Sequence, residues 1–235
     1  EGLCNSSGEV GLNFMDHPGS SVRMSTPEPL YSGRGPVNGT VCDQFEDGPF
    51  RRTRGGFRIG LDNKLQPEAL TARLVQDGAA PETIDHSLRQ QAANQIAIGG
   101  FIDVLPNREN RVSIDRARLD STGLPRIRLR FHLGEYENTA LEEMRRTLDT
   151  MARHLGATTS EHAGLYTANH LMGTMRMGNS RASSVVDRDC RAHDHPNLFV
   201  AGSSVFPTAG GAKAPTLTIA ALALRTADTI SRQIR

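Results

Sequence analysis

The sequence predicts an α+β fold in which an antiparallel sheet is backed by helices. Residues 126–132 alternate charged and apolar side chains, which is the pattern of an antiparallel strand with one face in water. Residues 138–155 place apolar side chains at three- and four-residue intervals, which is typical of an amphipathic helix. Residues 197–228 combine a short apolar run, a small-residue turn and a second helix in close succession.

The first part of the chain predicts loops, short strands and a broken helix. Residues 1–20 are rich in Gly, Ser and Asn and predict an extended loop, and residues 21–63 predict turns that separate short strands such as 56–61. Residues 67–95 predict two helical pieces with a break around 78–81. The second piece has apolar residues at four-residue spacing, namely Ile84, Leu88, Ala92 and Ile96.

Two strands joined by a polar loop are predicted between residues 97 and 115, and the strand over 126–132 follows them. Successive side chains of a strand point to opposite faces. We therefore expect Ile127, Leu129 and Phe131 to face a core while the intervening arginines face water.

The helix predicted over residues 138–155 begins with Thr139 and Glu142, which have the spacing of a capping box. Its apolar stripe consists of Leu141, Met144, Leu148, Met151 and Leu155. We interpret the two methionines as core filling and not as part of a cofactor site.

The C-terminal stretch predicts a strand and then a helix. The apolar run 197–201 is followed by Gly202 and predicts a short buried strand. The helix begins at Pro215 and is apolar or small on most sides, so we expect it to be buried. Its first turn leaves the backbone N–H groups of Thr216 and Leu217 unpaired and carries about half a positive charge. Such an end suits a ligand that gains negative charge, although most proline-started helices hold only water or a capping side chain.

Composition excludes several classes of protein. The 235 residues carry a formal net charge of only +1 without long runs of one sign, which predicts neither nucleic-acid binding nor a polybasic membrane patch. No apolar segment approaches the roughly 20 residues that span a bilayer. Cys4, Cys42 and Cys190 include no CxxC pair, so we expect three reduced thiols and no zinc ribbon or disulfide framework. We expect a soluble protein and favour the cytoplasm over the periplasm.

Three motifs near the C-terminus occur in a specific order. Residues 170–178 read His-x-x-Gly-Thr-x-x-Met-Gly, residues 197–207 read NLFVAGSSVFP, and residues 215–219 read PTLTI. Together they strongly resemble the C-terminal signature of the glucose-methanol-choline (GMC) flavin oxidoreductases, and within that family the bacterial sugar and polyol dehydrogenases. Residues 5–8 and 10–18 resemble segments from the middle of the family's chain.

The resemblance implies a division of the chain. Residues 1–20 are expected to belong to the FAD-binding domain, residues 21–165 to form the antiparallel substrate-binding domain, and residues 166–235 to supply the last elements of the Rossmann-like FAD-binding domain together with the active site. In the family the dinucleotide-binding fingerprint lies in the first half of the chain. This sequence has no strand followed by G-x-G-x-x-G, so we expect another chain or segment to supply that half.

The resemblance also implies a chemistry. His170 matches the catalytic histidine that removes the hydroxyl proton of an alcohol, a task for which imidazole is well suited near neutral pH. The hydride goes to N5 of FAD. Pro215, Thr216 and Leu217 are expected beside the flavin ring, where the helix end favours the negative charge of the reduced flavin. Gly202 and Ser203 match the turn near the phosphates and ribityl chain.

One position departs from the family pattern. The family has Asn or His around the start of the last motif as the partner of the catalytic histidine, whereas this chain has Lys213 and Ala214. Ala214 is also the expected helix N-cap, where alanine costs about 1 kcal/mol relative to asparagine. Three explanations stay open: His170 works alone, Lys213 is a cationic substitute, or the chain is an impaired homologue that binds flavin or sugar without turnover.

Two other histidine clusters are interpreted as turns. Asp16 and His17 precede a proline, and we interpret them as a turn in which Asp16 bonds to nearby backbone. His193 and His195 flank Asp194 before another proline, and without a third ligand nearby we interpret them as a turn and predict no metal site.

The hypothesis is thus the C-terminal half of an FAD-dependent oxidoreductase that acts on a small alcohol or sugar, with an electron-accepting redox partner as a further expectation from the resemblance. A noncatalytic subunit that completes a binding domain in a partner chain is one rival hypothesis. A flavin-containing hydroxynitrile lyase is another, because the resemblance also covers such lyases. The sequence does not name the substrate or the electron acceptor.

Overall fold

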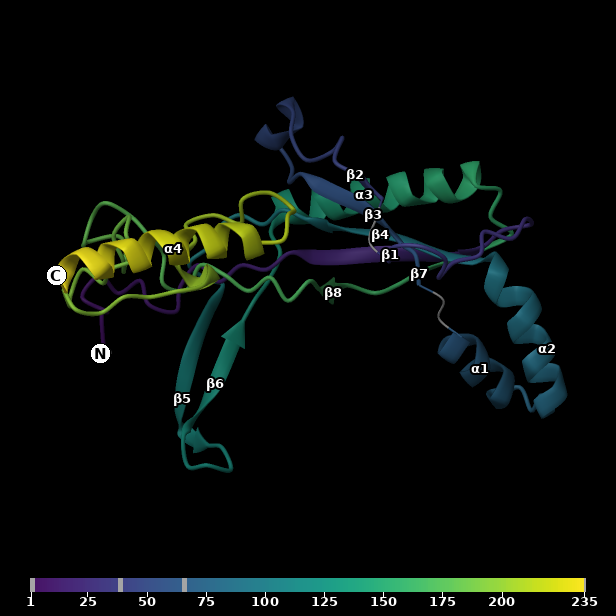
Figure 1. The fold of residues 1–235 in the computed structure, drawn as a ribbon, viewed down its shortest axis with the longest axis horizontal. Helices are drawn as coiled ribbons and strands as arrows, with labels where there is room; N and C mark the ends of the chain where they lie inside the picture. Colours follow the sequence, from purple (N-terminus) through teal and green to yellow (C-terminus); the bar gives the residue numbers. More distant parts are fainter. Residues whose placement is uncertain (1–2, 38–39, 65–66, 235) are drawn as a thin grey trace.

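The computed structural model describes residues 3–37, 40–64 and 67–234, so the outermost residues of the predicted domains, 1–2 and 235, lie outside the description. The main feature is a six-stranded antiparallel sheet in the order β2-β3-β4-β1-β7, with β8 also paired to β1 (Figure 1). Its strands are β1 (Pro18–Ser25), β2 (Val41–Cys42), β3 (Phe57–Asp62), β4 (Gln95–Ile102), β7 (Thr159–His162) and β8 (Tyr166–Thr167). Together with its helical backing, the sheet confirms the predicted α+β class.

Strand β1 occupies a central place that the sequence pattern did not reveal. It pairs with β4 from Gly19 opposite Phe101 to Ser25 opposite Gln95, and its other edge receives β7 and β8. The strands that were expected, β3 and β4, pair with each other as well. Where β3 and β4 pair, a Cβ on Gly100 would lie 1.9 Å from the Arg58 carbonyl oxygen, so the close approach of β3 requires glycine at position 100.

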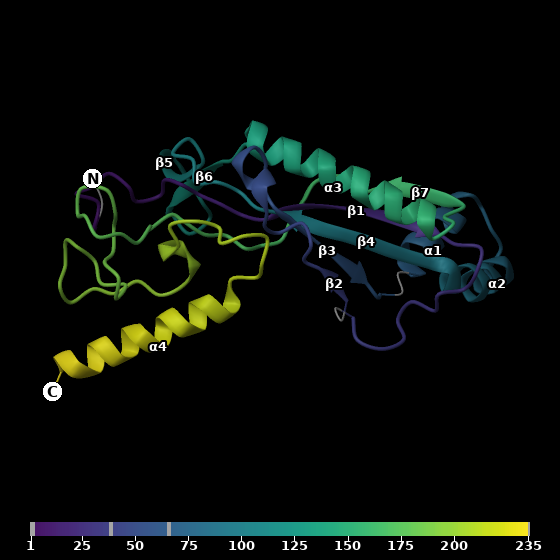
Figure 2. The same ribbon diagram turned by 90° about the horizontal axis from the view of Figure 1, so that it is seen from above.

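Helix α3 (Glu135–His154) lies along one face of the sheet, and Figure 2 shows it running over β1 and β4. Its buried stripe and the sheet residues that it covers form the sheet core: Val22, Met24, Phe57, Ile59, Ile96, Ile98, Ile102, Ala140, Leu141, Met144, Leu148 and Ala152. The predicted stripe is confirmed for Leu141, Met144 and Leu148. Leu155 is wrong as a core residue, because it lies just past the helix and is 42% exposed.

The start of α3 also differs from the prediction. The helix begins at Glu135, about one turn before the expected Thr139. The carboxylate of Glu137 accepts hydrogen bonds from the backbone N–H groups of Gly134 (2.9 Å) and Leu105 (3.0 Å). Glu137, and not Glu142, therefore closes the first turn, and it also ties the helix to the chain after β4.

The two helical pieces are confirmed as α1 (Pro67–Gln76) and α2 (Pro81–Gln91), at the end of the sheet remote from the chain termini (Figure 1). The predicted stripe of α2 runs too far. The 3₁₀ turn η2 (Ala92–Asn94) ends the helix, and Ile96 belongs to β4, where pairing with β1 supplies its backbone hydrogen bonds. A second 3₁₀ turn, η1 (Pro49–Arg52), precedes β3.

Strands β5 (Arg111–Leu119) and β6 (Pro125–Arg130) form a separate hairpin that projects from the body (Figure 1). The strand near residues 126–132 is present as expected and pairs with β5, but its predicted burial is wrong: Ile127 is 76% exposed and Leu129 is 55% exposed. Apart from a bridge between Arg111 and Leu12, the hairpin pairs only with itself within the described chain, so most side chains on both of its faces stay exposed. Phe131, beyond the strand, is half-buried against Phe14.

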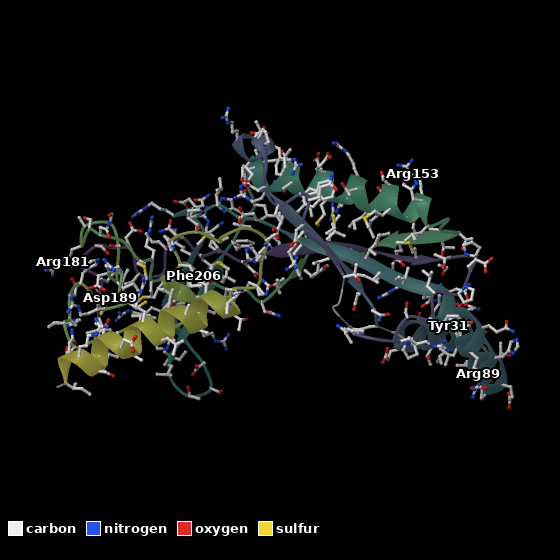
Figure 3. The ribbon with its side chains drawn as sticks, turned by 45° about the horizontal axis from the view of Figure 1, so that its top comes forward. Tyr31, Arg89, Arg153, Arg181, Asp189 and Phe206 are labelled. Carbon is white, nitrogen blue, oxygen red and sulfur yellow. The ribbon has the colours of Figure 1, made fainter. Side chains whose placement is uncertain are left out.

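A second core, the loop core, joins the N-terminal loop to the C-terminal third of the chain. Its buried members are Cys4, Met15, Val104, Met172, Val185, Val186, Cys190, Ala192, Val205, Phe206 and Ala209. Helix α4 (Thr216–Gln233) lies beside it, next to the labelled Phe206 in Figure 3, and both termini lie at this end of the molecule (Figure 2).

Two predictions for this part are wrong. Residues 197–201 do not form a strand, because only Phe199 finds a bridge partner, Arg191, within the described chain. Helix α4 is mostly exposed: Ile219 and Leu222 pack against the loop core, whereas Leu217 and Leu224 are 82% and 71% exposed. The 3₁₀ turn η3 (Ser203–Val205) follows Gly202.

The three cysteines are free, and Cys4 and Cys190 are buried in the loop core. Within the described ranges, no helix combines the length and the apolar character needed to cross a bilayer.

Two leucines of the α3 region provide a matched test of the sheet core. Leu148 is fully buried and Leu155 is largely exposed. We expect Leu148→Ala to lower the free energy of unfolding by about 2–5 kcal/mol, because it leaves a cavity, and Leu155→Ala to lower it by less than about 1 kcal/mol. Urea denaturation followed by circular dichroism measures both, and equal losses would contradict the assigned packing.

Candidate active site

Two segments far apart in sequence run antiparallel to each other and bring the predicted motifs together. The backbone groups of Met15 and Met172 exchange two hydrogen bonds of 2.9 Å each. Farther along, the N–H of Gly11 donates to the Thr174 carbonyl (2.7 Å), and the N–H of Ala168 donates to the His17 carbonyl (3.1 Å). Residues 11–19 and 166–174 therefore form an irregular pair, here called the hinge pair, between the two cores.

The carboxylate of Asp16 connects the two segments of the hinge pair. Its Oδ1 accepts hydrogen bonds from the backbone N–H groups of His17 (2.7 Å) and His170 (2.9 Å), and its Oδ2 accepts from the Thr167 hydroxyl. The Thr167 Oγ1 in turn accepts from the N–H of Asn169 (2.9 Å). A buried carboxylate with several donors is strongly held, so Asp16 fixes the backbone at His17 and at His170.

The glycine of the first motif has a steric role in this pair. Gly173 has φ +96°, and a Cβ there would lie 2.1 Å from the Asn13 carbonyl oxygen. Only glycine satisfies both conditions. Gly173, three residues after His170, therefore allows the backbone of the motif to pack against residues 13–15.

The prediction that Asp16 and His17 form a simple turn is wrong. His17 is completely buried, and its Nδ1 lies 3.0 Å from Nδ1 of His170, with the two rings almost perpendicular. Asp16 does bond to nearby backbone, as expected, but residues 15–17 pair with residues 168–172, which are remote in sequence, instead of forming a turn. A second imidazole thus reaches His170 from the N-terminal loop.

Burial favours the neutral form of both rings. The pKa of His17 lies below its ordinary value because of burial and, next, because of the neighbouring His170; Asp103, Asp16 and the Ala209 backbone oppose this shift. The pKa of His170 is also lowered by burial and is opposed by Asp16. Both histidines are consequently uncharged at neutral pH, as a proton acceptor must be.

His170 lines a cavity of about 690 Å³. Most of the strand residues that line it alternate with those that pack against α3, so the cavity lies over the other face of the sheet. Phe101 and Tyr166 form an aromatic wall next to His170, with ring centroids 5.8 Å apart in an edge-to-face contact. Charged side chains of the sheet and its connections line the rest of the cavity, namely Arg23, Arg58, Asp62, Lys64 and Glu161. The cavity is thus aromatic at His170 and polar away from it.

The predicted partner position reaches this cavity, but the predicted cation does not. Ala214 lines the cavity together with His170. The ammonium of Lys213 instead lies 2.8 Å from the Glu46 carboxylate and 3.9 Å from that of Asp43. The hydrogen bond to Glu46 raises the pKa of Lys213, which keeps the side chain charged and held away from His170. Ala214 is not the N-cap of α4, because Pro215 occupies that position.

The positions expected to contact a flavin are open. Helix α4 starts at Thr216 without any side-chain cap, so its first N–H groups, including that of Leu217, are available at a positive helix end next to the cavity. Gly202 has φ +109°, and a Cβ there would meet no described atom within 4 Å. The Ser203 hydroxyl donates to the Leu171 carbonyl (2.6 Å), so the turn at 202–203 lies against the His170 segment. These residues fit a group that carries negative charge and approaches the backbone closely.

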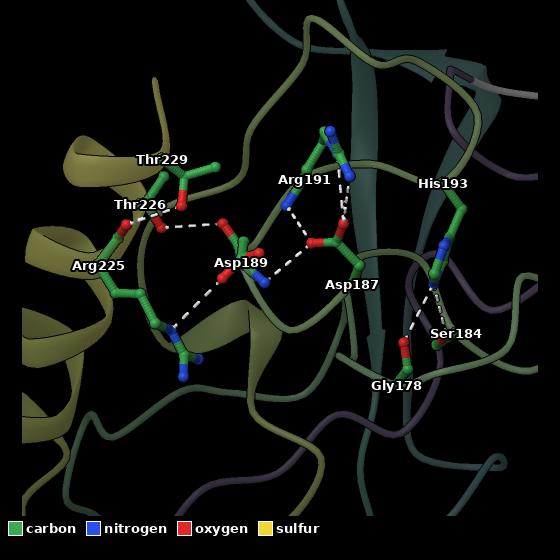
Figure 4. Close-up of polar contacts among 9 residues, drawn as sticks. All are labelled: Gly178, Ser184, Asp187, Asp189, Arg191, His193, Arg225, Thr226 and Thr229. Atoms are coloured by element: carbon green, nitrogen blue, oxygen red, sulfur yellow. Dashed lines mark hydrogen bonds and ion pairs between the residues drawn. The ribbon is translucent and has the colours of Figure 1, made fainter. Parts of the chain in front are cut away.

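The cluster at 193–195 forms a bend, as predicted. His193 Nε2 lies 2.9 Å from the Ser184 hydroxyl and 3.2 Å from the Gly178 carbonyl oxygen, so the ring holds two loops together (Figure 4). In the same view, the Thr226 hydroxyl of α4 donates to the Asp189 carbonyl (3.2 Å). No group of three or more His, Cys, Asp or Glu side chains suited to a metal ion occurs among residues 3–37, 40–64 and 67–234.

Sequence reasoning missed four side chains at this site: Asp16, His17, Phe101 and Tyr166. The sequence shows an acidic residue followed by histidine and proline, but a turn is the commoner meaning of that pattern. The long-range partner that gives the pair its place, His170, lies 153 residues away.

Comparisons with known proteins show which family the chain is similar to. The GMC oxidoreductase C-terminal family model matches residues 106–223. The large subunit of fructose dehydrogenase from Gluconobacter japonicus is 33% identical over 235 residues, covering 100% of this chain and 43% of the relative. The 2-methyl-1,2-propanediol dehydrogenase of Mycolicibacterium austroafricanum is 33% identical over 259 residues, covering 99% of this chain and 44% of the relative.

Solved structures show the same fold at lower identity. Formate oxidase of Aspergillus oryzae, in a variant described for its effect on FAD modification, aligns with a TM-score of 0.65 and 17% identity over 97% of this chain and 48% of its own. Pyridoxine 4-oxidase from Mesorbium loti aligns with a TM-score of 0.61 and 18% identity over 95% of this chain and 44% of its own.

The chain spans less than half of the length of each of these four proteins. GMC oxidoreductases are FAD-dependent flavoproteins, and the two sequence relatives are dehydrogenases of a sugar and a diol by name. The family model covers half of the chain, and its matched range includes His170, Ala214 and the start of α4. The chain belongs to the GMC oxidoreductase family.

Proposed function

We propose that this chain forms the C-terminal part of an FAD-dependent oxidoreductase that oxidises a hydroxyl group of a small alcohol or sugar, with His170 as the base. One observation carries the proposal. Ala214, two residues before the start of α4, lines the same cavity as His170. A proton acceptor thus lies in the cavity that reaches the segment leading into an open, positive helix end, an arrangement that suits proton removal and stabilisation of negative charge.

His170 removes the hydroxyl proton. Burial lowers its pKa, so the imidazole is neutral and able to accept a proton at neutral pH. The Asp16 carboxylate favours the protonated ring that results and also holds the His170 backbone. A base must be in place before the reaction, and the hinge pair provides that placement.

FAD, when bound, accepts the hydride that leaves the alcohol carbon. Pro215, Thr216 and Leu217 would hold the charged end of the flavin ring, where a helix end contributes roughly 0.3–2 kcal/mol in favour of negative charge. Gly202 and Ser203 would lie against the phosphate and ribityl part, because Gly202 leaves room for close approach.

The cavity supports a polyhydroxylated substrate. Charged side chains such as Arg58, Asp62 and Glu161 offer donors and acceptors to several hydroxyl groups. Phe101 and Tyr166 supply an apolar wall beside the base, which suits the carbon skeleton. The names of the relatives, fructose dehydrogenase and a propanediol dehydrogenase, support the same class of substrate.

The two cores support the division proposed for the chain. Residues 21–165 contain the sheet core, while residues 1–20 and 166–235 contribute most of the loop core. We assign the first to substrate binding and the other two to FAD binding. Another chain or segment would supply the glycine-rich half of the FAD domain. An electron-accepting partner also belongs to this proposal, and one relative is by name the large subunit of its enzyme.

Flavin reduction in the full-length, FAD-loaded enzyme tests the proposed reaction. We expect sugars or polyols to bleach the flavin absorbance of the wild type. We expect His170→Ala to keep its flavin but to reduce it about 10²- to 10⁴-fold more slowly, the usual contribution of a general base. Bound flavin that no alcohol or sugar bleaches would favour a noncatalytic subunit. Cyanide release from hydroxynitriles without flavin reduction would favour a lyase.

The partner position provides a second prediction. We expect Ala214→Asn to raise the rate of alcohol oxidation by about 10- to 1000-fold, because an amide there adds a hydrogen-bond donor where charge develops. We expect Lys213→Met to change the rate less than about threefold, since Glu46 holds the ammonium away from His170. Steady-state kinetics of both variants decide between the partner position and Lys213, and a loss of rate in Ala214→Asn would remove the partner hypothesis.

The two neutral histidines also predict a pH dependence of stability. Their pKa values are lowered in the folded state, so the unfolded state binds more protons once the pH falls below about 6.5. Stability is thus complete above that pH and falls by up to about 1.4 kcal/mol per group for each pH unit below it.

Urea unfolding of the protein at pH 7.5 and pH 5.5 measures this dependence. We expect His17→Asn to lose less stability on acidification than the wild type, because one of the two buried groups no longer titrates. His86→Asn, which replaces an exposed histidine on α2, should match the wild type. Identical slopes in all three proteins would show that His17 is not held neutral by the fold.

A further inference from the structure

The contact between His17 and His170 allows only certain placements of hydrogen. Their Nδ1 atoms lie 3.0 Å apart, so one of them carries the hydrogen and the other is a bare acceptor. Neutral imidazole has a single N–H, so the choice at Nδ1 also decides the state of each Nε2. If His17 were the donor, Nε2 of His170 would carry a hydrogen and could not accept the proton of an alcohol.

The surroundings of His17 decide between the two placements. Its Nε2 is buried and makes no hydrogen bond to the described chain. The Asp103 carboxylate and the Ala209 backbone both act on this ring in the direction that favours a bound proton. One oxygen of Asp103 is engaged by Arg51 at 2.6 Å, and the other is buried without a partner. These oxygen atoms favour a hydrogen on Nε2 of His17, the nitrogen that does not face His170, and therefore leave its Nδ1 without a hydrogen.

We propose that His17 is a positioning residue whose bare Nδ1 accepts the hydrogen of His170 Nδ1 and thereby leaves Nε2 of His170 bare toward the cavity. This inference rests on the proposed function, in which His170 is the base. The chain carries Ala214 in the cavity at the position where the family has a partner residue. His17 instead provides a second imidazole at Nδ1 of His170, the ring nitrogen opposite the proposed basic Nε2.

The arrangement also serves the protonated state. When the O–H bond of the alcohol breaks and an N–H bond forms at Nε2, the Nδ1–H of His170 continues to point at His17. The hydrogen bond then has a charged donor and becomes stronger. His17 itself stays neutral, because burial and the adjacent ring lower its pKa, so it remains an acceptor throughout.

The charged and titratable groups around His17 and His170 come from several elements of the described chain. Asp16 precedes β1 and contacts the backbone of both histidines, Asp103 follows β4 and is paired with Arg51, and Tyr166 of β8 borders the cavity. The titratable and charged groups farther along the cavity are Arg23, Arg58, Asp62, Lys64, Glu161 and His162. A pH profile of a His17 variant must be compared with a matched variant that leaves all these groups in place.

Asparagine and leucine at position 17 provide that match, because their side chains have the same shape and differ in the acceptor. In the full-length, FAD-loaded enzyme we expect His17→Leu to lower kcat/KM about 10- to 100-fold, as loss of an orienting partner does, with flavin content unchanged. We expect the loss to lie in kcat and the acid limb of the profile to move to lower pH. His17→Asn should recover most of the rate and the wild-type limb, since its amide oxygen accepts from His170 Nδ1.

A readout independent of turnover is the reactivity of His170 toward diethyl pyrocarbonate, which attacks a bare ring nitrogen. Peptide mass spectrometry at several pH values should show slower modification of His170 in His17→Leu than in the wild type and His17→Asn. ¹⁵N NMR of the histidine-labelled wild type, assigned with His170→Ala, should show hydrogen on Nδ1 of His170. This last measurement reads the wild-type protein and needs a variant, His170→Ala, only for the assignment.

Hydrogen on Nε2 of His170, or equal rates and reactivities in the Leu and Asn variants, would overturn the role of His17. Equal losses in both variants accompanied by loss of flavin would also overturn it and assign His17 a purely structural role. Failure of the proposed function is distinct, because His170→Ala would then reduce flavin normally. If His170→Ala is inactive and His17→Leu is fully active, only the role of His17 fails.

Discussion

The organisation of the site depends on the Asp16 carboxylate, which connects the two segments of the hinge pair. It accepts hydrogen bonds from the N–H groups of His17 and His170 and from the Thr167 hydroxyl. The N-terminal loop is thereby attached to the motif segment just where the chain passes from the sheet to the loop core. Without this carboxylate, two buried backbone N–H groups would lack partners, a loss of about 1–3 kcal/mol each.

This attachment explains how a sheet, a loop and a helix build one cavity. Strand β1 continues directly from the hinge pair and carries the centre of the sheet, while β8 on its edge brings Tyr166 next to His170. The loop core on the other side places the segment before α4 so that Ala214 reaches the same space. The proposed substrate-binding and flavin-binding surfaces therefore share a border, and the proposed base lies on it.

The charged side chains near the border fall into two groups: some form ion pairs with one another, and others line the cavity. Glu46 engages Lys213, and Arg51 engages Asp103, so these two cations are paired away from His170. Aromatic rings and a second imidazole border the His170 ring, and burial lowers its pKa against the opposing effect of Asp16, so the proposed base is uncharged at neutral pH. The polar side chains of the cavity lie farther along the sheet, where a substrate with several hydroxyl groups would find its partners.

The sequence by itself determined the elements whose pattern is local: the stripe of α3, strands β3 and β4, the two helices after Pro67, and the motif that contains His170. Only the tertiary structure decided the place of β1, the exposure of Ile127 and the contact between His17 and His170. The physical reason is range. Periodicity and capping act within a few residues, whereas burial and the state of an imidazole depend on what distant segments bring to it.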